Sequence, residues 1–130
     1  LEYKSCITRS LKIHGYRDEP ESISPRWYYG SDAGAVAALA QTEGMSQTIH
    51  GDLPYEFADV AWAIRHEMAR TVDDVLARRT RALLLNAQAA IESANIVAET
   101  MAKELHRDEM WKSEQVDRFT SVAKGYIAAT

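Results

Sequence analysis

The sequence predicts an all-α protein, a compact bundle of about five helices over residues 31–130 that follows an extended N-terminal arm and loop over residues 1–30. Two observations lead to this prediction. Residues 1–30 contain no alanine, whereas residues 31–130 contain 20, and alanine is the best helix former. In the second part, apolar residues also recur every three or four positions, which is the spacing of one helix face.

The arm combines an extended part, a polar loop and an aromatic cluster. Residues 7–14 are typical of an extended segment or short strand, and the run from Arg17 to Ser22 contains Pro20 and reads as a loop. Trp27, Tyr28 and Tyr29 follow at the junction with the bundle. We expect this cluster to anchor the arm or another domain.

Each expected helix begins at a side chain that can accept hydrogen bonds from the free amides of the first turn. These N-cap residues are Ser31 or Asp32 for residues 33–41, Asp52 for residues 55–68, Thr71 for a short helix through residue 79, Asn86 for residues 87–105 and Asp108 for a last helix through residue 126. Gly44 is placed to end the first helix, and Pro54 lies in the first turn of the second. Asp74 completes a capping box with Thr71.

Apolar stripes identify the faces that we expect to be buried. The longest helix carries Ala87, Ala90, Ile91, Ala94, Val97, Ala98, Met101 and Leu105, and the last carries Val116, Phe119, Val122, Ala123 and Tyr126. Because many of these residues are small alanines, the helices can approach one another closely.

Composition excludes several classes of protein. Of the 130 residues, 46% are hydrophobic and 26% charged, which is a globular rather than a disordered composition. The net charge of −4 disfavours a general attraction to nucleic acid or anionic lipid. No apolar run reaches the roughly 20 residues of a membrane span, and no basic amphipathic helix is evident, so membrane contact through this domain is not predicted.

Catalytic and metal-binding motifs are weak. His66-Glu67 begins like a zinc-protease signature, but Arg70 occupies the position of the second histidine and cannot bind zinc. We therefore interpret His14, His50, His66 and His106 as structural or surface residues, and expect no metal site. The single Cys6 allows no internal disulfide and makes a poor candidate nucleophile. The glycines are too scattered for a nucleotide-binding loop, so we expect no cofactor-binding residue and no catalytic residue in this chain.

Arginine is the most concentrated charge feature, at positions 65, 70, 78, 79 and 81. It is open to three interpretations: a solvated face with internal ion pairs, a surface that docks a protein, or a nucleic-acid site. Arg78 is four residues after Asp74, a spacing that allows a helical ion pair. Three arginines within four residues cannot share one direction on a helix. We therefore expect Arg78, Arg79 and Arg81 to include at least one structural residue and at least one that docks another domain. A structural arginine that is buried and hydrogen-bonded would be costly to replace.

Three segments resemble a known family. They are Tyr29-Gly30-Ser31-Asp32-Ala33, the run EMARTVDDVLARRTR from Glu67 to Arg81, and Met101-Ala102-Lys103-Glu104-Leu105. They resemble the C-terminal domain of FAD-dependent glycerol-3-phosphate dehydrogenases and oxidases. In the arm, Cys6, Thr8 and the segment from Leu11 to Gly15 resemble the passage that leaves the flavin domain.

The resemblance implies a fragment that has no activity of its own. The parent enzyme would oxidise sn-glycerol 3-phosphate to dihydroxyacetone phosphate with a bound FAD, and it would pass electrons to quinone or to oxygen. FAD and the catalytic residues would belong to the N-terminal flavin domain of the same polypeptide. That domain is the expected partner of this chain, with Arg78, Arg79 and Arg81 as candidate docking residues.

The resemblance also implies a cytoplasmic parent enzyme, with peripheral attachment to the inner membrane and homo-oligomerisation as options, and no nucleic acid as partner. Two other functions were weighed. One is a free-standing helical module that binds an acidic partner through the arginine-rich face. The other is a small metal hydrolase built on His66 and Glu67, which Arg70 argues against.

Overall fold

The structure is a computed structural model that describes residues 6–13, 15–17 and 26–127. The elements found in these residues confirm the all-α prediction. The elements in order are η1 (Trp27–Asp32), α1 (Ala33–Thr42), α2 (Phe57–His66), η2 (Asp74–Arg79), α3 (Ala82–Leu85), α4 (Ala87–Leu105), α5 (Glu109–Ala123) and η3 (Lys124–Tyr126). Of these, η1 and η3 are 3₁₀ helices and η2 is a π-helix. The described residues contain no strand, only an isolated bridge between Thr48 and Glu56.

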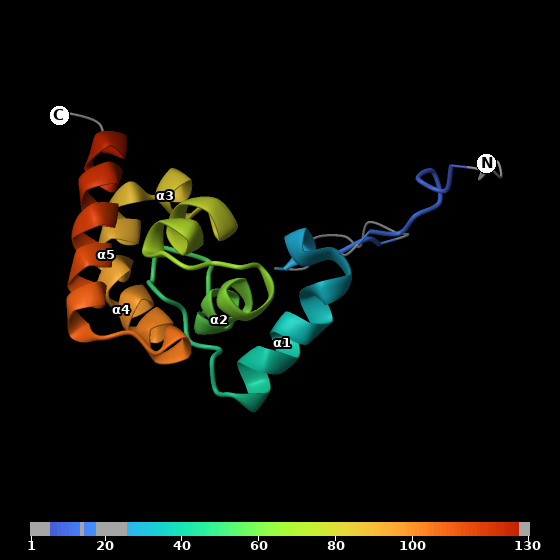
Figure 1. Cartoon of the computed structure of the whole chain (residues 1–130), viewed down its shortest axis with the longest axis horizontal. Helices are drawn as coiled ribbons and strands as arrows, with labels where there is room; N and C mark the ends of the chain where they lie inside the picture. Colours follow the sequence, from blue (N-terminus) through green and yellow to red (C-terminus); the bar gives the residue numbers. More distant parts are fainter. Residues whose placement is uncertain (1–5, 14, 18–25, 128–130) are drawn as a thin grey trace, which may run out of the picture.

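Helices α4 and α5 form an antiparallel pair along one side of the molecule, with α2 beside α4 and α1 farther out (Figure 1). Both predicted caps of the pair are confirmed. The Asn86 side chain accepts from the Ala89 amide at 3.1 Å, and the Asp108 side chain accepts from the Trp111 amide at 2.9 Å. Between the two helices, His106 adopts a left-handed backbone that ends α4.

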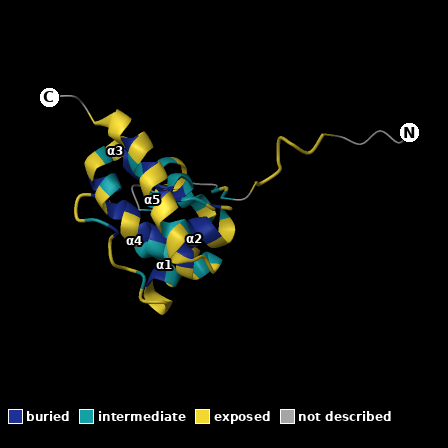
Figure 2. Ribbon diagram, turned by 60° about the vertical axis from the view of Figure 1, so that its left-hand side comes forward, coloured by how far each residue is buried: buried dark blue, intermediate teal, exposed yellow. Residues whose placement is uncertain are grey.

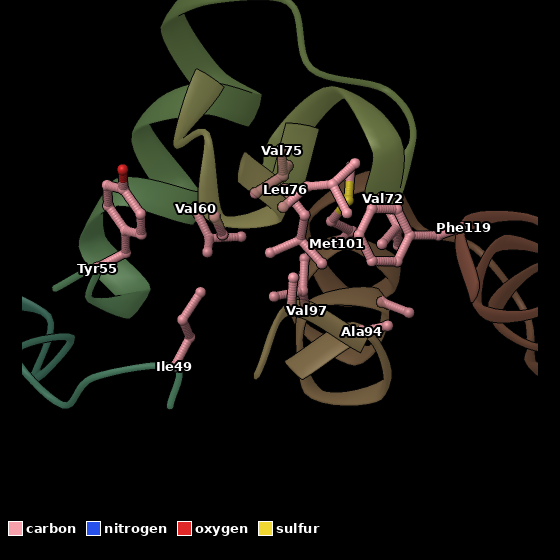
Figure 3. Close-up of a cluster of buried hydrophobic side chains, with 14 of the residues drawn as sticks. Ile49, Tyr55, Val60, Val72, Val75, Leu76, Ala94, Val97, Met101 and Phe119 are labelled. Atoms are coloured by element: carbon pink, nitrogen blue, oxygen red, sulfur yellow. The ribbon is translucent and has the colours of Figure 1, made fainter. Parts of the chain in front are cut away.

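The main core lies between α2, η2, α4 and α5, and the close-up in Figure 3 shows its centre. Phe119 of α5 points toward Met101 and Ala94 of α4, and these three side chains are at most 1% exposed. Burial is concentrated on the inward faces of the helices (Figure 2). Of the expected α4 stripe, Ala90, Ala94, Val97, Ala98 and Met101 are buried, and Ala87, Ile91 and Leu105 pack against the core from its edge.

A smaller second cluster attaches α1 to the bundle. Val36 and Ala40 of α1 pack against Ala58 and Trp62 of α2. Trp62 is only 8% exposed, and Tyr29 packs against the same cluster. The first helix therefore contacts the bundle through α2 rather than through the main core.

The second helix begins later than expected, and its expected cap is wrong. Glu56, not Asp52, is the N-cap, and it forms a capping box with Asp59. Pro54 and Tyr55 remain in the preceding loop, where the Phe57 amide donates to the Gln47 carbonyl at 3.0 Å. The helix also ends at His66 instead of Met68, because the backbone turns left-handed at Met68, with φ 57°.

The short third helix has the expected cap but an unexpected geometry. The Thr71 hydroxyl accepts from the Asp74 amide at 3.1 Å, and the Asp74 carboxylate accepts from the Thr71 amide at 3.0 Å. The segment through Arg79 is a π-helix rather than an α-helix, and the additional short helix α3 follows it. Neither feature was expected from the apolar periodicity.

The stripe of the last helix is partly wrong. Phe119 and Ala123 are buried as expected, but Val122 is 48% exposed and Tyr126 is 56% exposed. Gln115 is buried in their place, and its side-chain oxygen accepts from the Val72 amide at 3.4 Å. The buried positions 115, 119 and 123 are spaced four apart, which rotates the inward face away from Val122.

The described part of the arm leads away from the helices (Figure 1). Residues 8–10 form a turn rather than a strand, with the Ser10 amide donating to the Ile7 carbonyl at 3.1 Å. His14 and most of the expected loop after Arg17 lie outside the described residues. Near the bundle, Gly30 has φ 58°, and a Cβ at this position would lie 1.7 Å from the Gly15 carbonyl oxygen. Only glycine fits this contact.

No helix in the described part of the chain has the length and apolar character needed to cross a membrane.

The hydrogen bonds to Asp74 lead us to expect that the protein loses stability in acid. Burial opposes its ionisation, but hydrogen bonds from the Arg70 and Thr71 amides and from Arg78 hold the pKa of Asp74 below its usual value. A carboxyl whose pKa is lowered by folding stabilises the protein above its unfolded pKa of about 3.9, and this contribution disappears as the pH falls through the folded pKa. We therefore expect urea unfolding to show falling stability below about pH 4.

The variant Asp74→Asn should show a shallower loss of stability with acid than the wild type. The matched control is Asp117→Asn, because Asp117 lies on the exposed face of α5, and it should keep the acid dependence of the wild type. Equal acid dependence in Asp74→Asn and the wild type would contradict this role for Asp74.

Candidate functional site

A groove of about 770 Å³ lies where the N-terminal junction meets the ends of α2 and η2. We call it the junction groove. Its lining residues come from four separate parts of the chain: Trp27, Tyr28, Tyr29, Pro54, Tyr55, Glu67, Met68, Arg78, Arg79, Thr80 and Arg81. The groove therefore brings together the aromatic cluster and the three candidate docking arginines, which the sequence places about 50 residues apart.

Arg78 is paired on the outer side of η2. Its guanidinium contacts Asp73 at 2.7 Å and also donates to Asp74, which confirms the expected pair four residues apart. The side chain is 61% exposed. Its charge is thus largely neutralised by the preceding turn.

Arg79 joins η2 to the end of α2. Its guanidinium donates to the backbone carbonyl of Glu67 at 2.7 and 3.1 Å and lies 3.7 Å from the Glu67 carboxylate. Burial raises the pKa of Glu67 although Arg79 opposes the shift. Arg79 therefore fixes one wall of the groove and balances the only carboxylate among the lining residues.

Arg81 differs from the other two arginines. It follows the end of η2, as expected, but its backbone is left-handed with φ 61°. Its exposed guanidinium has no hydrogen bond or ion pair with any described residue. It still acts on the groove electrostatically, because its charge lowers the pKa of Tyr55 against the larger raising effect of burial.

None of the trio Arg78, Arg79 and Arg81 is buried. Arg78 and Arg79 lie on the exposed side of η2, while Val75 and Leu76 of the same helix enter the core. Arg78 and Arg79 pair within the domain at its surface, so a structural member need not be a buried one. The other two arginines lie outside the groove. Arg65 bridges Glu43 and Glu104 at 2.9 and 2.6 Å, and Arg70 donates to backbone carbonyls. Docking by the trio remains a prediction.

The aromatic wall is held by a buried carboxylate. Asp59 is 1% exposed and accepts from the Tyr29 hydroxyl at 2.9 Å and the Tyr28 hydroxyl at 3.5 Å. Burial, followed by the charge of Asp59, raises the pKa of both tyrosines, so both stay protonated donors. Arg26 closes the network through Glu56 at 2.6 Å. Tyr28 and Tyr29 thus hold the junction against α2, while the anchoring of another domain stays a prediction.

Trp27 is the exposed end of this wall. It lies edge-on to Tyr28, with ring centroids 6.2 Å apart, and 65% of the residue is exposed. Tyr28 is 41% exposed. Together with Met68, which is 76% exposed, these side chains give the groove an apolar rim.

No group of three or more His, Cys, Asp or Glu side chains among the described residues could hold a metal ion. His66 stacks on Trp62, with ring centroids 4.0 Å apart, and His50 contacts Glu92 at 3.0 Å. Cys6 is exposed and pairs with the Thr8 hydroxyl at 2.9 Å, which lowers the pKa of its thiol. None of these residues lines the junction groove.

The glycines of this chain lie at positions 15, 30, 34, 44, 51 and 125. This spacing does not match the glycine-rich fingerprint that holds a dinucleotide pyrophosphate. The lining residues of the junction groove offer recognition chemistry: exposed apolar side chains and a cationic guanidinium.

Several lining residues were not expected from the sequence. Met68 looked like the last apolar residue of a helix, and Tyr55 like a residue inside it. Pro54 is the one local signal that could have been used, because proline pre-sets the backbone for a turn as well as for the first turn of a helix. The left-handed turn at Arg81 has no sequence signal, since glycine is the usual residue there.

Comparisons with known proteins agree with this picture. The family model for the C-terminal domain of alpha-glycerophosphate oxidase matches residues 26–114. The mitochondrial glycerol-3-phosphate dehydrogenase of Mus musculus is 36% identical over 110 residues, covering 78% of this chain and 15% of that protein. The Homo sapiens protein of the same name is 37% identical over 106 residues, covering 75% and 14%.

A bacterial relative shows the same partial coverage. Glycerol-3-phosphate dehydrogenase 1 of Mycobacterium bovis is 40% identical over 92 residues, which cover 62% of this chain and 17% of that protein. The chain thus spans only about 15% of the length of the curated relatives that it matches. No solved structure matches it significantly.

Proposed function

The chain belongs to the family of the C-terminal domain of alpha-glycerophosphate oxidase, and from that membership we propose that it is the non-catalytic C-terminal helical domain of an aerobic-type FAD-dependent glycerol-3-phosphate dehydrogenase. We call the complete enzyme the parent polypeptide. Its reaction would be the oxidation of sn-glycerol 3-phosphate to dihydroxyacetone phosphate. The flavin, held by the part of the polypeptide outside this chain, would take up the two electrons and pass them to quinone.

The junction groove is the observation that supports a docking role for the domain. Trp27, Tyr28 and Tyr29 line it, and they directly follow Arg26, where the arm enters the bundle. Its rim exposes Trp27, Tyr28 and Met68 together. Large apolar side chains exposed side by side are typical of a surface that another protein surface covers.

We assign this chain a supporting role in the proposed enzyme. The Asp59 network holds Tyr28 and Tyr29 against α2, and the exposed rim would pack on the flavin domain. A free-standing module that binds an acidic partner would use the same arginines, but membership of the family favours a domain of a longer polypeptide. A cytoplasmic location, with peripheral attachment to the inner membrane, follows from the same proposal.

The test compares the 130-residue chain with the parent polypeptide. We expect the purified parent to carry flavin absorbance and to reduce a dye when sn-glycerol 3-phosphate is added. The chain alone should be colourless and inactive, because its sequence lacks the glycine-rich fingerprint that binds a dinucleotide. Glycerol without phosphate serves as the control substrate. Stoichiometric flavin on the chain, or a flavin-loaded parent that does not oxidise glycerol 3-phosphate, would refute the assignment.

A further inference from the structure

Two lining residues of the junction groove have a left-handed backbone, which L-amino acids rarely adopt. Met68 has φ 57° and Arg81 has φ 61°. Both follow the end of a helix, where glycine would adopt this conformation without the steric cost of a side chain. The only other non-glycine residue of this kind among those described is His106, which lies outside the groove.

The neighbours of each residue hold the strained backbone in place. Next to Met68, the buried Ala69 donates its amide to the Ala63 carbonyl at 2.9 Å, and Arg79 binds the Glu67 carbonyl. Next to Arg81, the hydroxyl of the buried Thr80 donates to the Val75 carbonyl at 2.8 Å. The flanking residues are thus fixed in the fold while the two strained side chains project from it.

Within the described residues, neither of those two side chains has a hydrogen bond or an ion pair that offsets the strain. Met68 is 76% exposed, and the Arg81 guanidinium has no partner among the described residues. In contrast, Arg78 and Arg79 are balanced by Asp73, Asp74 and Glu67. The groove therefore presents one uncompensated cation next to an apolar rim, and its complement is a carboxylate next to an apolar side chain.

We propose that the junction groove receives a segment of the parent polypeptide, outside this chain, that carries a carboxylate beside an aromatic or aliphatic side chain. Arg81 binds the carboxylate as a bidentate partner, and Met68 packs against the apolar side chain. This inference rests on the proposed function, because it takes the occupant from the same polypeptide. The chain spans only about 15% of its curated relatives, which leaves ample polypeptide to supply such a segment.

Methionine oxidation offers a direct measurement, because the chain contains a matched pair. Met68 on the groove rim is 76% exposed, and Met110 at the start of α5 is 77% exposed and outside the groove. Peroxide oxidation followed by mass spectrometry should modify both equally in the 130-residue chain. In the parent polypeptide, we expect the oxidation rate of Met68 to fall about tenfold, because peroxide then reaches Met68 only in the molecules whose groove is open. The oxidation rate of Met110 should not change.

Glycine substitutions separate docking from folding. Arg81→Gly keeps the left-handed backbone, so the unfolding temperature of the 130-residue chain should stay the same or rise by up to about 4 °C. In the parent polypeptide, Arg81→Gly and Arg81→Glu should restore fast oxidation of Met68. The control His106→Gly removes the same kind of strain outside the groove, so it should behave like Arg81→Gly in stability and like the wild type in oxidation.

Three outcomes would overturn the inference. Equal oxidation of Met68 in the chain and the parent would show that nothing covers the groove. Slow oxidation that persists in Arg81→Glu would show that the occupant does not depend on a carboxylate at Arg81. Protection of Met68 in the chain alone at high concentration would identify a second copy as the occupant. Dye reduction by the wild-type parent, measured separately, reports on the proposed function in every case.

Discussion

Replacing Asp59 by alanine is expected to lower the free energy of unfolding by about 3–5 kcal/mol, because it breaks a buried charged network. The carboxylate is 1% exposed and accepts from the Tyr29 hydroxyl at 2.9 Å and from the Glu56 amide at 2.7 Å. Alanine would leave these donors without an acceptor in a buried setting, and an unsatisfied buried donor costs about 1–3 kcal/mol. It would also leave Arg26 with Glu56 as its remaining carboxylate partner.

Urea unfolding of the 130-residue chain measures this effect. Asp117→Ala is the matched control, because Asp117 is exposed on α5, and it should change stability by about 0.5 kcal/mol or less. Tyr29→Phe removes a single donor of the network and should cost about 1 kcal/mol. A loss in Asp59→Ala no larger than in the control would show that the network does not stabilise the junction.

The same substitution is expected to affect the groove. Tyr28 and Tyr29 form one wall of the junction groove, and Asp59 is the acceptor of both hydroxyls. Without it, the two hydroxyls lose this acceptor, while Tyr29 keeps its packing against Trp62 and the second cluster. The proposed domain interface and the stability of the junction thus depend on one carboxylate.

Local signals in the sequence predicted the helices best where capping chemistry is strong. Asn86 and Asp108 begin α4 and α5 as expected, because a short polar side chain before an apolar stripe satisfies the free amides of the first turn. Asp52 resembled such a cap but was wrong. The chain instead uses Glu56, which forms a capping box with Asp59. Backbone hydrogen bonds from Phe57 to Gln47 and from Ile49 to Tyr55 hold the residues on either side of Glu56, and these distant contacts cannot be read from the local sequence.

The candidate site could be predicted only in part. The sequence singled out Arg78, Arg79 and Arg81 and, separately, the aromatic cluster at Trp27, but contacts distant in sequence bring them together. The conformations of Met68 and Arg81 depend on hydrogen bonds made by their buried neighbours. Such tertiary contacts override local preference, which would have put glycine at both positions.

The last helix shows how far periodicity can mislead. The spacing of apolar residues placed Phe119 and Val122 on one buried face, but the structure buries Phe119 to 1% and leaves Val122 48% exposed. Gln115 lies on the inward face instead, where its side-chain oxygen accepts from the amide of Val72 in the turn before η2. The buried face of α5 therefore includes a polar residue, and the apolar residues alone indicated this face only approximately.

Phe119→Ala is expected to lower the free energy of unfolding by about 3–5 kcal/mol, because it removes a large side chain from the centre of the main core and leaves a cavity. The ring lies near Met101 and Ala94 (Figure 3), in a cluster whose members come from five helices and cannot all move inward to fill the space. Val122→Ala is the matched control on the same helix, and it should cost about 0.5 kcal/mol or less because Val122 is half exposed. Urea unfolding of both variants measures which of these two side chains of α5 faces the core in solution. Similar losses in the two variants would favour the stripe read from the sequence over the face that the structure buries.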